Sequence, residues 1–290
     1  MNFKSVCWDI TSKCNEHCLF CYRDLDSEEA SLEKNKKILK NLISIGVGKI
    51  SFVGGEPLLY KHLFDLVKYG RSLDDNVQYS ITTNAVLLAS FNEHNRFNIN
   101  TKLVEKIVDS FDWITFSMDA PTDQLQSLMG RNPHHISRVI AILDYINRSN
   151  CDVKIKVNTV VSKININSLH KMIPLLENCK INRWKLFKFL PSRGIALTNK
   201  TKFEISTQDY QKCISELTTK SHLNITYNND LDFQKTYITI NSEGYLSVYD
   251  GSKYDLIIDM STSDCSKVFN YVNEELHNER RCNYGTGGTL

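Results

Sequence analysis

Three cysteines near the N-terminus are the residues with the clearest chemistry in this chain of 290 residues. Cys14, Cys18 and Cys21 follow the spacing C-x3-C-x2-C, and Phe20 stands directly before the third. Closely spaced thiolates can hold an iron–sulfur cluster, and a cluster of four irons normally takes four protein ligands. A 4Fe–4S cluster on these three would therefore keep one iron open for a ligand that reacts.

Two other interpretations of these cysteines have to be weighed. A structural zinc site needs four ligands from Cys and His, and His17 in the same loop is an available fourth. A disulfide framework is typical of small secreted chains, and we see no apolar signal segment here. The remaining cysteines are scattered, as expected for thiols of a reducing cytosol: Cys7, Cys151, Cys179, Cys213, Cys265 and Cys282.

A second motif follows the apolar run 50–53, in the order Gly54-Gly55-Glu56-Pro57. Two glycines at the end of a strand allow the backbone to come close to a ligand. The cysteine loop and this turn together resemble the radical SAM superfamily. The resemblance implies a 4Fe–4S cluster, S-adenosylmethionine (SAM) at its open iron, and cleavage of SAM to a 5′-deoxyadenosyl radical. The turn would line the methionine end of SAM.

The charge balance excludes some classes of partner. Thirty-five basic residues nearly balance 33 acidic ones, so no broad attraction to nucleic acid or membranes is implied. No apolar run approaches the length of a membrane span. We therefore expect a cytoplasmic monomer that binds neither nucleic acid nor membrane.

Strand-like and helix-like runs alternate, which favours a parallel α/β fold. The predicted strands are 5–11, 49–53, 78–84, 113–119, 153–161 and 183–190. The predicted helices are 31–45, 60–71, 101–110, 134–149 and 168–179, the fourth capped by Asn132 with Pro133 in its first position. These units make the partial (β/α)6 barrel that the resemblance implies, over residues 1–200.

Residues 201–290 predict a small C-terminal α+β extension that covers the substrate site. It holds a helix near 206–221, a strand at 224–227, a hairpin over 236–249 and a last helix over 264–279. The hairpin turns at Ser242-Glu243-Gly244, and the glycine-rich tail 285–288 is flexible by composition.

Every predicted strand of the barrel alternates apolar and polar residues, so one face would pack on helices and the other would look into the lumen. One polar strand face could simply be solvated, but six in phase predict a polar lumen. A small closed barrel would fill its lumen with apolar side chains. Charges there are costly unless they meet a ligand or each other. The cations among them suit a triphosphate, with Arg giving forked contacts and Lys point charges.

Several segments resemble, more narrowly, the viperin family of radical SAM enzymes. They are Lys154-Ile155-Lys156-Val157-Asn158, Arg183-Trp184-Lys185, Gly48-Lys49-Ile50-Ser51-Phe52 before the glycine turn, and Met129-Gly130-Arg131. The likeness runs from about residue 5 to 190 and faintly through the hairpin. It implies an antiviral or anti-phage enzyme that converts a nucleoside triphosphate to its 3′-deoxy-3′,4′-didehydro analogue, with a flavodoxin- or ferredoxin-type electron donor.

The resemblance also assigns residues. The triphosphate would be bound by Lys49, Arg131, Lys156, Asn158, Arg183 and Lys185, of which Lys156 and Lys185 are the predicted catalytic residues. SAM would be bound by Phe20, Gly54, Gly55, Glu56, Asn84 and Ser117. The lumen must hold SAM as well, which favours the smaller bases of CTP and UTP.

The chain also departs from the viperin pattern. Cys7 stands where the family has Asn, the N-terminal amphipathic helix of animal viperins is missing, and the C-terminal third differs. Alternatives are a radical SAM GTP cyclase, whose second cysteine cluster Cys265 and Cys282 do not supply, a peptide-modifying enzyme, and a non-catalytic zinc-binding module.

Overall fold

Six parallel strands form the centre of the computed structural model, which describes residues 5–23, 27–93, 96–149, 151–228, 237–251, 253–271 and 277. They are hydrogen-bonded in chain order: β1 (Val6–Thr11), β2 (Lys49–Gly54), β3 (Gln78–Thr83), β6 (Trp113–Ser117), β7 (Lys154–Val161) and β8 (Arg183–Lys188). The sheet is curved but not closed, which confirms the predicted partial barrel. Within the described residues, no helix is both long and apolar enough to cross a bilayer.

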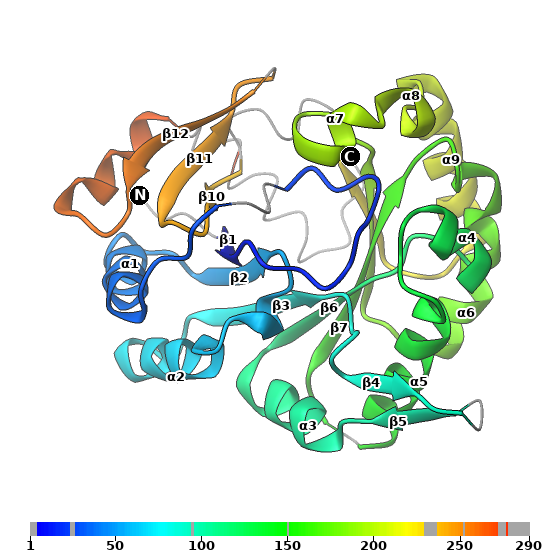
Figure 1. Ribbon diagram of the computed structural model, residues 1–290, viewed down its shortest axis with the longest axis horizontal. Coiled ribbons are helices and arrows are strands. Elements are labelled where there is room, and N and C mark those ends of the chain that lie inside the picture. Colours follow the sequence, from blue (N-terminus) through cyan, green and yellow to red (C-terminus); the bar gives the residue numbers. More distant parts are fainter. Residues whose placement is uncertain are drawn as a thin grey trace.

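Helices cover the convex face of this sheet (Figure 1). They are α1 (Leu32–Ser44), α2 (Leu63–Leu73), α3 (Thr101–Ser110), α5 (His135–Arg148), α6 (Met172–Asn178) and α9 (Thr207–Lys220). α1 shows why they form there. Ser31 caps it by accepting a hydrogen bond from the Lys34 amide, and its buried residues Ile38, Leu39 and Leu42 follow helical spacing.

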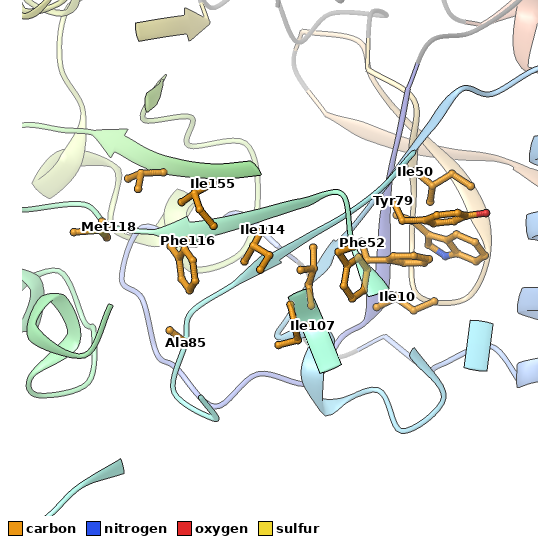
Figure 2. Close-up of a cluster of buried hydrophobic side chains, with 14 of the residues drawn as sticks. Ile10, Ile50, Phe52, Tyr79, Ala85, Ile107, Ile114, Phe116, Met118 and Ile155 are labelled. Atoms are coloured by element: carbon orange, nitrogen blue, oxygen red, sulfur yellow. The ribbon is translucent and has the colours of Figure 1, made fainter. Parts of the chain in front are cut away.

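The apolar strand residues fill the layer between sheet and helices (Figure 2). Phe52 of β2 lies between Trp8 and Tyr79, with ring centroids 5.7 and 6.3 Å away. Ile114, Phe116 and the other outward residues are also buried. Because side chains alternate along a strand, this packing turns the polar set toward the concave face.

The C-terminal segment extends the same sheet at both of its edges. β9 (Ile225–Asn228) pairs in parallel with β8, and β10 (Thr239–Ile240) pairs in parallel with β1. β11 (Tyr245–Tyr249) and β12 (Tyr254–Asp259) follow antiparallel. The predicted hairpin is confirmed as β10–β11, whereas β12 was not predicted. The last predicted helix begins as a 3₁₀ helix, Ser263–Asn270. Most of its remainder and the 285–288 tail lie outside the described residues.

The predicted start of the fourth helix is wrong. α5 begins at His135, after His134 in a left-handed conformation with φ of 61°. Asn132 is not its cap, because its backbone N–H donates to Glu16 and its side chain donates to the Asn15 carbonyl. Asp123, in α4 (Asp123–Leu128), instead accepts from the Ile136 amide at 2.8 Å.

Smaller elements were also not predicted. They are the hairpin of β4 (Ala89–Phe91) and β5 (Phe97–Ile99), α4, and the short helices α7 (Gly194–Thr198) and α8 (Lys200–Phe203). A 3₁₀ helix at Ile166–Lys171 precedes α6, so Pro174 falls in the first turn of α6, where its missing N–H costs no helical hydrogen bond.

Candidate active site

A cavity of about 870 Å³ occupies the concave side of the sheet. The inward faces of the barrel strands, the cysteine loop and the extension line it. Of the predicted site residues, these are in its wall: Cys14, Cys18, Cys21, Phe20, Lys49, Gly54, Gly55, Asn84, Ser117, Arg131, Lys156, Asn158, Arg183 and Lys185.

The cavity has two chemically different ends. The cysteine loop follows Thr11, the last residue of β1, and so lies at the carboxyl ends of the parallel strands. Lys49, Lys154 and Arg183 are the first residues of β2, β7 and β8, at the opposite end. A ligand between the two ends would meet thiols at one end and cations at the other.

Backbone hydrogen bonds from three elements hold the cysteine loop in place. The turn after β2 donates from Gly55 to the Thr11 carbonyl at 2.8 Å and from Glu56 to the Lys13 carbonyl at 2.7 Å. Leu19 donates to the Met129 carbonyl at 2.9 Å, after α4. In α7, the Ala196 amide donates to the Cys21 carbonyl at 2.9 Å. The loop conformation is therefore fixed by its surroundings.

Close approach explains two of the glycines beside this loop. A Cβ on Gly55 would lie 2.0 Å from the Lys13 carbonyl oxygen, and one on Gly130 would lie 2.5 Å from that of His17. Gly130 also has a φ of 91°, which side chains rarely allow. Both positions must be glycine for the loop to pack as it does.

Glu56 is the one predicted site residue that does not lie in the described cavity wall. Its buried carboxylate accepts from the Thr83 hydroxyl at 2.8 Å, the Asn84 amide at 2.7 Å and the Leu58 amide at 3.3 Å. Burial raises the pKa of Glu56 to about 7, against the opposing effect of these hydrogen bonds. Glu56 reaches the cavity through Asn84, whose side chain donates to Asn15 in the cysteine loop.

Arg131 lies at the thiol end of the cavity and is held by protein groups. Its Nε and Nη2 both donate to Asp119 Oδ2, at 3.1 and 2.8 Å, and its guanidinium lies 5.4 Å from the Phe20 ring centroid. Asp119 uses only two of the guanidinium nitrogens, and the predicted contact of Arg131 with a triphosphate stays a prediction. In the observed geometry Arg131 supports the ring of Phe20.

Glu16, between the first two cysteines, belongs to a second buried network. It accepts from the Asn132 amide at 2.8 Å, and His135 Nδ1 lies 3.4 Å from its other oxygen. Burial would raise the pKa of Glu16, but hydrogen bonding to His135 and the charge of Arg131 lower it overall. His135 Nε2 contacts the Ser117 carbonyl at 2.7 Å. The network joins the cysteine loop to the end of β6.

The donor set suits an iron–sulfur cluster better than zinc. Three soft thiols face one end of the cavity, and burial raises the pKa of each of them, so cluster binding must displace their protons. His17, the candidate fourth zinc ligand, is exposed and outside the cavity wall. Among the described residues, no three Cys, His, Asp or Glu side chains converge as ligands of a single metal ion.

The other end of the cavity gathers positive charge. Burial, followed by the charges of Lys185 and Lys49, holds the pKa of Lys156 well below its usual value. Lys185 is buried and donates to the Tyr237 hydroxyl at 2.9 Å, which donates in turn to Asn228. Glu16 and Asp119 are the acidic residues of the described wall, and both lie at the thiol end. The cation end can therefore hold a polyanion.

Comparison with known proteins identifies the family. The model of the Radical SAM superfamily matches residues 8–176, more than half of the chain. The chain belongs to the radical SAM superfamily. It is therefore an enzyme whose cofactors are a 4Fe–4S cluster and SAM, and its three cysteines, at the carboxyl ends of the strands, fit that cluster.

Relatives of this radical SAM enzyme carry more specific names. An S-adenosylmethionine-dependent nucleotide dehydratase of Flammeovirga pacifica is 27% identical over 256 residues, which covers 83% of this chain and 80% of the relative. One of Selenomonas ruminantium is 26% identical and covers 90% and 91%. Streptococcus suis SuiB, solved with precursor peptide SuiA, superposes with a TM-score of 0.73 at 18% identity, over 97% of this chain and 67% of SuiB. That likeness shows the shared fold.

Sequence reasoning missed several residues of this radical SAM cavity. Trp113 is in register with the inward residues Thr115 and Ser117, so strand alternation could have found it. Tyr237 and Tyr254 also line the cavity, but they come from the extension. Their position depends on the pairing of β10 with β1, which no local sequence pattern predicts.

Proposed function

We propose that this radical SAM enzyme is a viperin-like nucleotide dehydratase. It would remove water from the ribose of a nucleoside triphosphate to give the 3′-deoxy-3′,4′-didehydro analogue. The observation that carries the proposal is the group of cations on β2, β7 and β8, Lys49, Lys156, Arg183 and Lys185, at the end of the cavity opposite the thiols. The names of the two bacterial dehydratases support the same reaction class.

The residues would divide the work between the two ends of the cavity. The cluster and SAM, when bound, would supply a 5′-deoxyadenosyl radical that takes the hydrogen atom from C4′ of the ribose. The 3′-hydroxyl would then leave as water with a proton, and one electron from the external donor would complete the didehydro product. Asn84 and Ser117 line the cavity near its thiol end and would bind the ribose and carboxylate of SAM. Phe20, braced by Arg131, would lie near the adenine. Gly54 and Gly55 let the backbone approach the methionine end.

The cations would act by positioning. Holding the phosphates at the strand starts would fix the nucleotide ribose toward the thiol end, so the protein would supply orientation while the cofactors supply the radical chemistry. Lys156 and Lys185 are the proposed catalytic pair; they lie on the neighbouring strands β7 and β8, and the charge of Lys185 lowers the pKa of Lys156. Asn158, whose buried Oδ1 has no partner among the described residues, would complete the phosphate site with its amide.

The finer assignments rest on the chain's own features. A cavity that must also hold SAM favours CTP or UTP over a purine nucleotide. The product would terminate polymerase chains, which gives the enzyme a role in antiviral or anti-phage defence. A flavodoxin- or ferredoxin-type donor, a monomeric state and a cytoplasmic location stay predictions.

The test is incubation with SAM, a reductant and each ribonucleoside triphosphate, followed by mass spectrometry. We expect CTP or UTP to stimulate 5′-deoxyadenosine formation and to give a product lighter by one water. Stimulation by GTP alone, with a product of unchanged mass, would instead indicate cyclase chemistry. Absence of nucleotide-dependent turnover would leave peptide modification as the alternative.

A further inference from the structure

The indole of Trp113 is surrounded by cations at the strand starts. Its ring centroid lies 4.7 Å from Lys49 Nζ, 5.1 Å from Arg183 Cζ and 5.4 Å from Lys154 Nζ. These side chains come from β2, β8 and β7, whereas Trp113 is the first residue of β6. One ring therefore gathers charges from both sides of its own strand.

Trp113 and its three cations all line the cavity. Trp113 is partly exposed and lines the cavity, whereas Trp8 and Trp184 are fully buried in the core. Lys154 is the direct cross-strand partner of Trp113 and also lines the cavity. Among the described residues that line this end, none is Asp or Glu. The indole face is one group at this end that can offset the crowding of like charges.

We propose that Trp113 is a positioning residue that holds Lys49, Lys154 and Arg183 ready for the terminal phosphates of the substrate, and that Lys154 is a further phosphate ligand. The proposal rests on the proposed nucleotide function and adds two residues to its phosphate site. The negative face of the indole attracts cations. A charge-assisted hydrogen bond to a phosphate oxygen is stronger, so a bound triphosphate takes the cations over.

The position of the ring predicts which phosphate it serves. Lys156 and Lys185 stand two residues further along their strands than Lys154 and Arg183, toward the thiol end. A strand advances about 3.3 Å per residue, so this step is about 6.6 Å, long enough to reach from the phosphate nearest the ribose to the far end of a triphosphate. The cations beside Trp113, namely Lys49, Lys154 and Arg183, would therefore contact the phosphate furthest from the ribose. They would select triphosphates over shorter nucleotides.

The experiment compares the nucleoside tri-, di- and monophosphate in nucleotide-dependent 5′-deoxyadenosine formation by the cluster-loaded enzyme. We expect Trp113→Leu to raise the triphosphate KM about tenfold, with kcat and the monophosphate KM nearly unchanged. Trp113→Phe keeps an aromatic face and should recover most of the loss. Lys154→Gln should raise the triphosphate KM about threefold or more and leave the monophosphate KM as it is.

A matched control removes a cation–π contact elsewhere. Phe64→Leu on α2 loses the contact with Lys106, 4.1 Å from its ring centroid, and should leave every KM unchanged. Equal losses for triphosphate and monophosphate in Trp113→Leu, or a lower kcat at constant KM, would overturn the proposal. So would a wild-type triphosphate KM in that variant.

Inorganic triphosphate separates this proposal from the proposed function. Calorimetry should show that it binds the cluster-loaded enzyme, and that Trp113→Leu weakens the binding about tenfold. Such binding without turnover of any nucleotide would retain the anion site and reject the dehydratase. Nucleotide turnover with no effect of Trp113→Leu on triphosphate binding would retain the dehydratase and reject the role of Trp113.

Discussion

At the scale of single residues, Lys156 carries the most unusual electrostatic environment of the cavity. Burial lowers its pKa most, and the nearby charges of Lys185, Lys49 and Arg183 lower it further, so Lys156 loses its proton at a lower pH than an ordinary lysine. A triphosphate favours the ammonium form and raises the pKa again. The nucleotide should therefore bind together with a proton.

This coupling gives the first prediction. Calorimetric titration of nucleotide at pH values between the lowered pKa of Lys156 and the usual pKa of lysine, in buffers of different ionisation enthalpy, should show proton uptake. The affinity should fall as the pH rises through that window. Lys156→Met should abolish the uptake and weaken binding about tenfold or more, since a charge-assisted contact contributes about 1.5–3 kcal/mol. An enthalpy that is independent of buffer would contradict the lowered pKa of Lys156.

The three thiols give a second prediction at the same scale. Cys14→Ala, Cys18→Ala or Cys21→Ala should abolish iron loading and SAM cleavage, because each removes one of three ligands. Cys179→Ala and Cys213→Ala are the matched controls, since both are buried in the core away from the cavity. Iron analysis and the visible spectrum of anaerobically purified protein measure the outcome. Full SAM cleavage by Cys18→Ala would rule out the assigned cluster site.

At the scale of elements, the glycine turn after β2 supports the cysteine loop, in addition to its proposed place beside SAM. Gly55→Ala should cost about 1–3 kcal/mol of unfolding free energy, because the new methyl group meets the Lys13 backbone. The displaced loop should also load less iron. Denaturant unfolding and iron content together measure both effects.

Gly70→Ala on α2 provides the control for Gly55. Its Cβ would lie 2.1 Å from the Tyr79 hydroxyl, in a part of the core that does not touch the cysteine loop. It should lose comparable stability while loading iron normally. Equal iron loss in both variants would mean that the turn acts through global stability alone.

Local patterns predicted the elements that the lumen depends on, and failed where distant segments decide. The alternation in β2, β6, β7 and β8 correctly turned Lys49, Ser117, Lys156 and Lys185 inward, because burial of one strand face is a local property. The cap of α5 failed, because Asn132 is recruited by the cysteine loop and Asp123 replaces it. Both of these contacts join segments that are brought together only by the fold, so the sequence alone does not reveal them.

In the candidate site, too, local sequence reveals some residues and long-range contacts decide the others. The sequence reveals the three ligand candidates Cys14, Cys18 and Cys21 because one short loop contains them all. It also reveals Gly55, because the glycine turn directly follows a strand. Arg131 was assigned by resemblance, but its partner Asp119 lies across a turn and a helix from it. Trp113 follows the alternation of its own strand, whereas Tyr237 reaches the wall only because β10 pairs with the distant β1. The residues at each end of the cavity could therefore be predicted from local sequence, whereas the partners supplied by distant segments could not.

At the scale of the whole molecule, the extension contributes residues to the cavity wall and is bonded to α1, the first helix of the barrel. Lys34 of α1 pairs with Asp259 at 2.9 Å, and Asn41 donates to the carbonyls of Met260 and Thr262 at 2.9 and 3.0 Å. Figure 1 shows β10, β11 and β12 beside α1. Tyr237 and Tyr254 thus reach the cavity from a segment that α1 holds.

The last prediction follows from this fastening. The double variant Lys34→Ala, Asn41→Ala should loosen the extension by about 1–3 kcal/mol, because it removes an ion pair and two hydrogen bonds. Amide exchange in 237–249 and 254–271 should become faster, and the nucleotide KM should rise as the tyrosines lose their positions. Iron content should not change, because the cysteine loop is held by other elements.

Lys36→Ala is the control. It breaks the Lys36–Glu33 pair on the same helix and should leave amide exchange unchanged. Slow exchange of both segments in the double variant, with a raised KM, would mean that α1 acts on the site by another route.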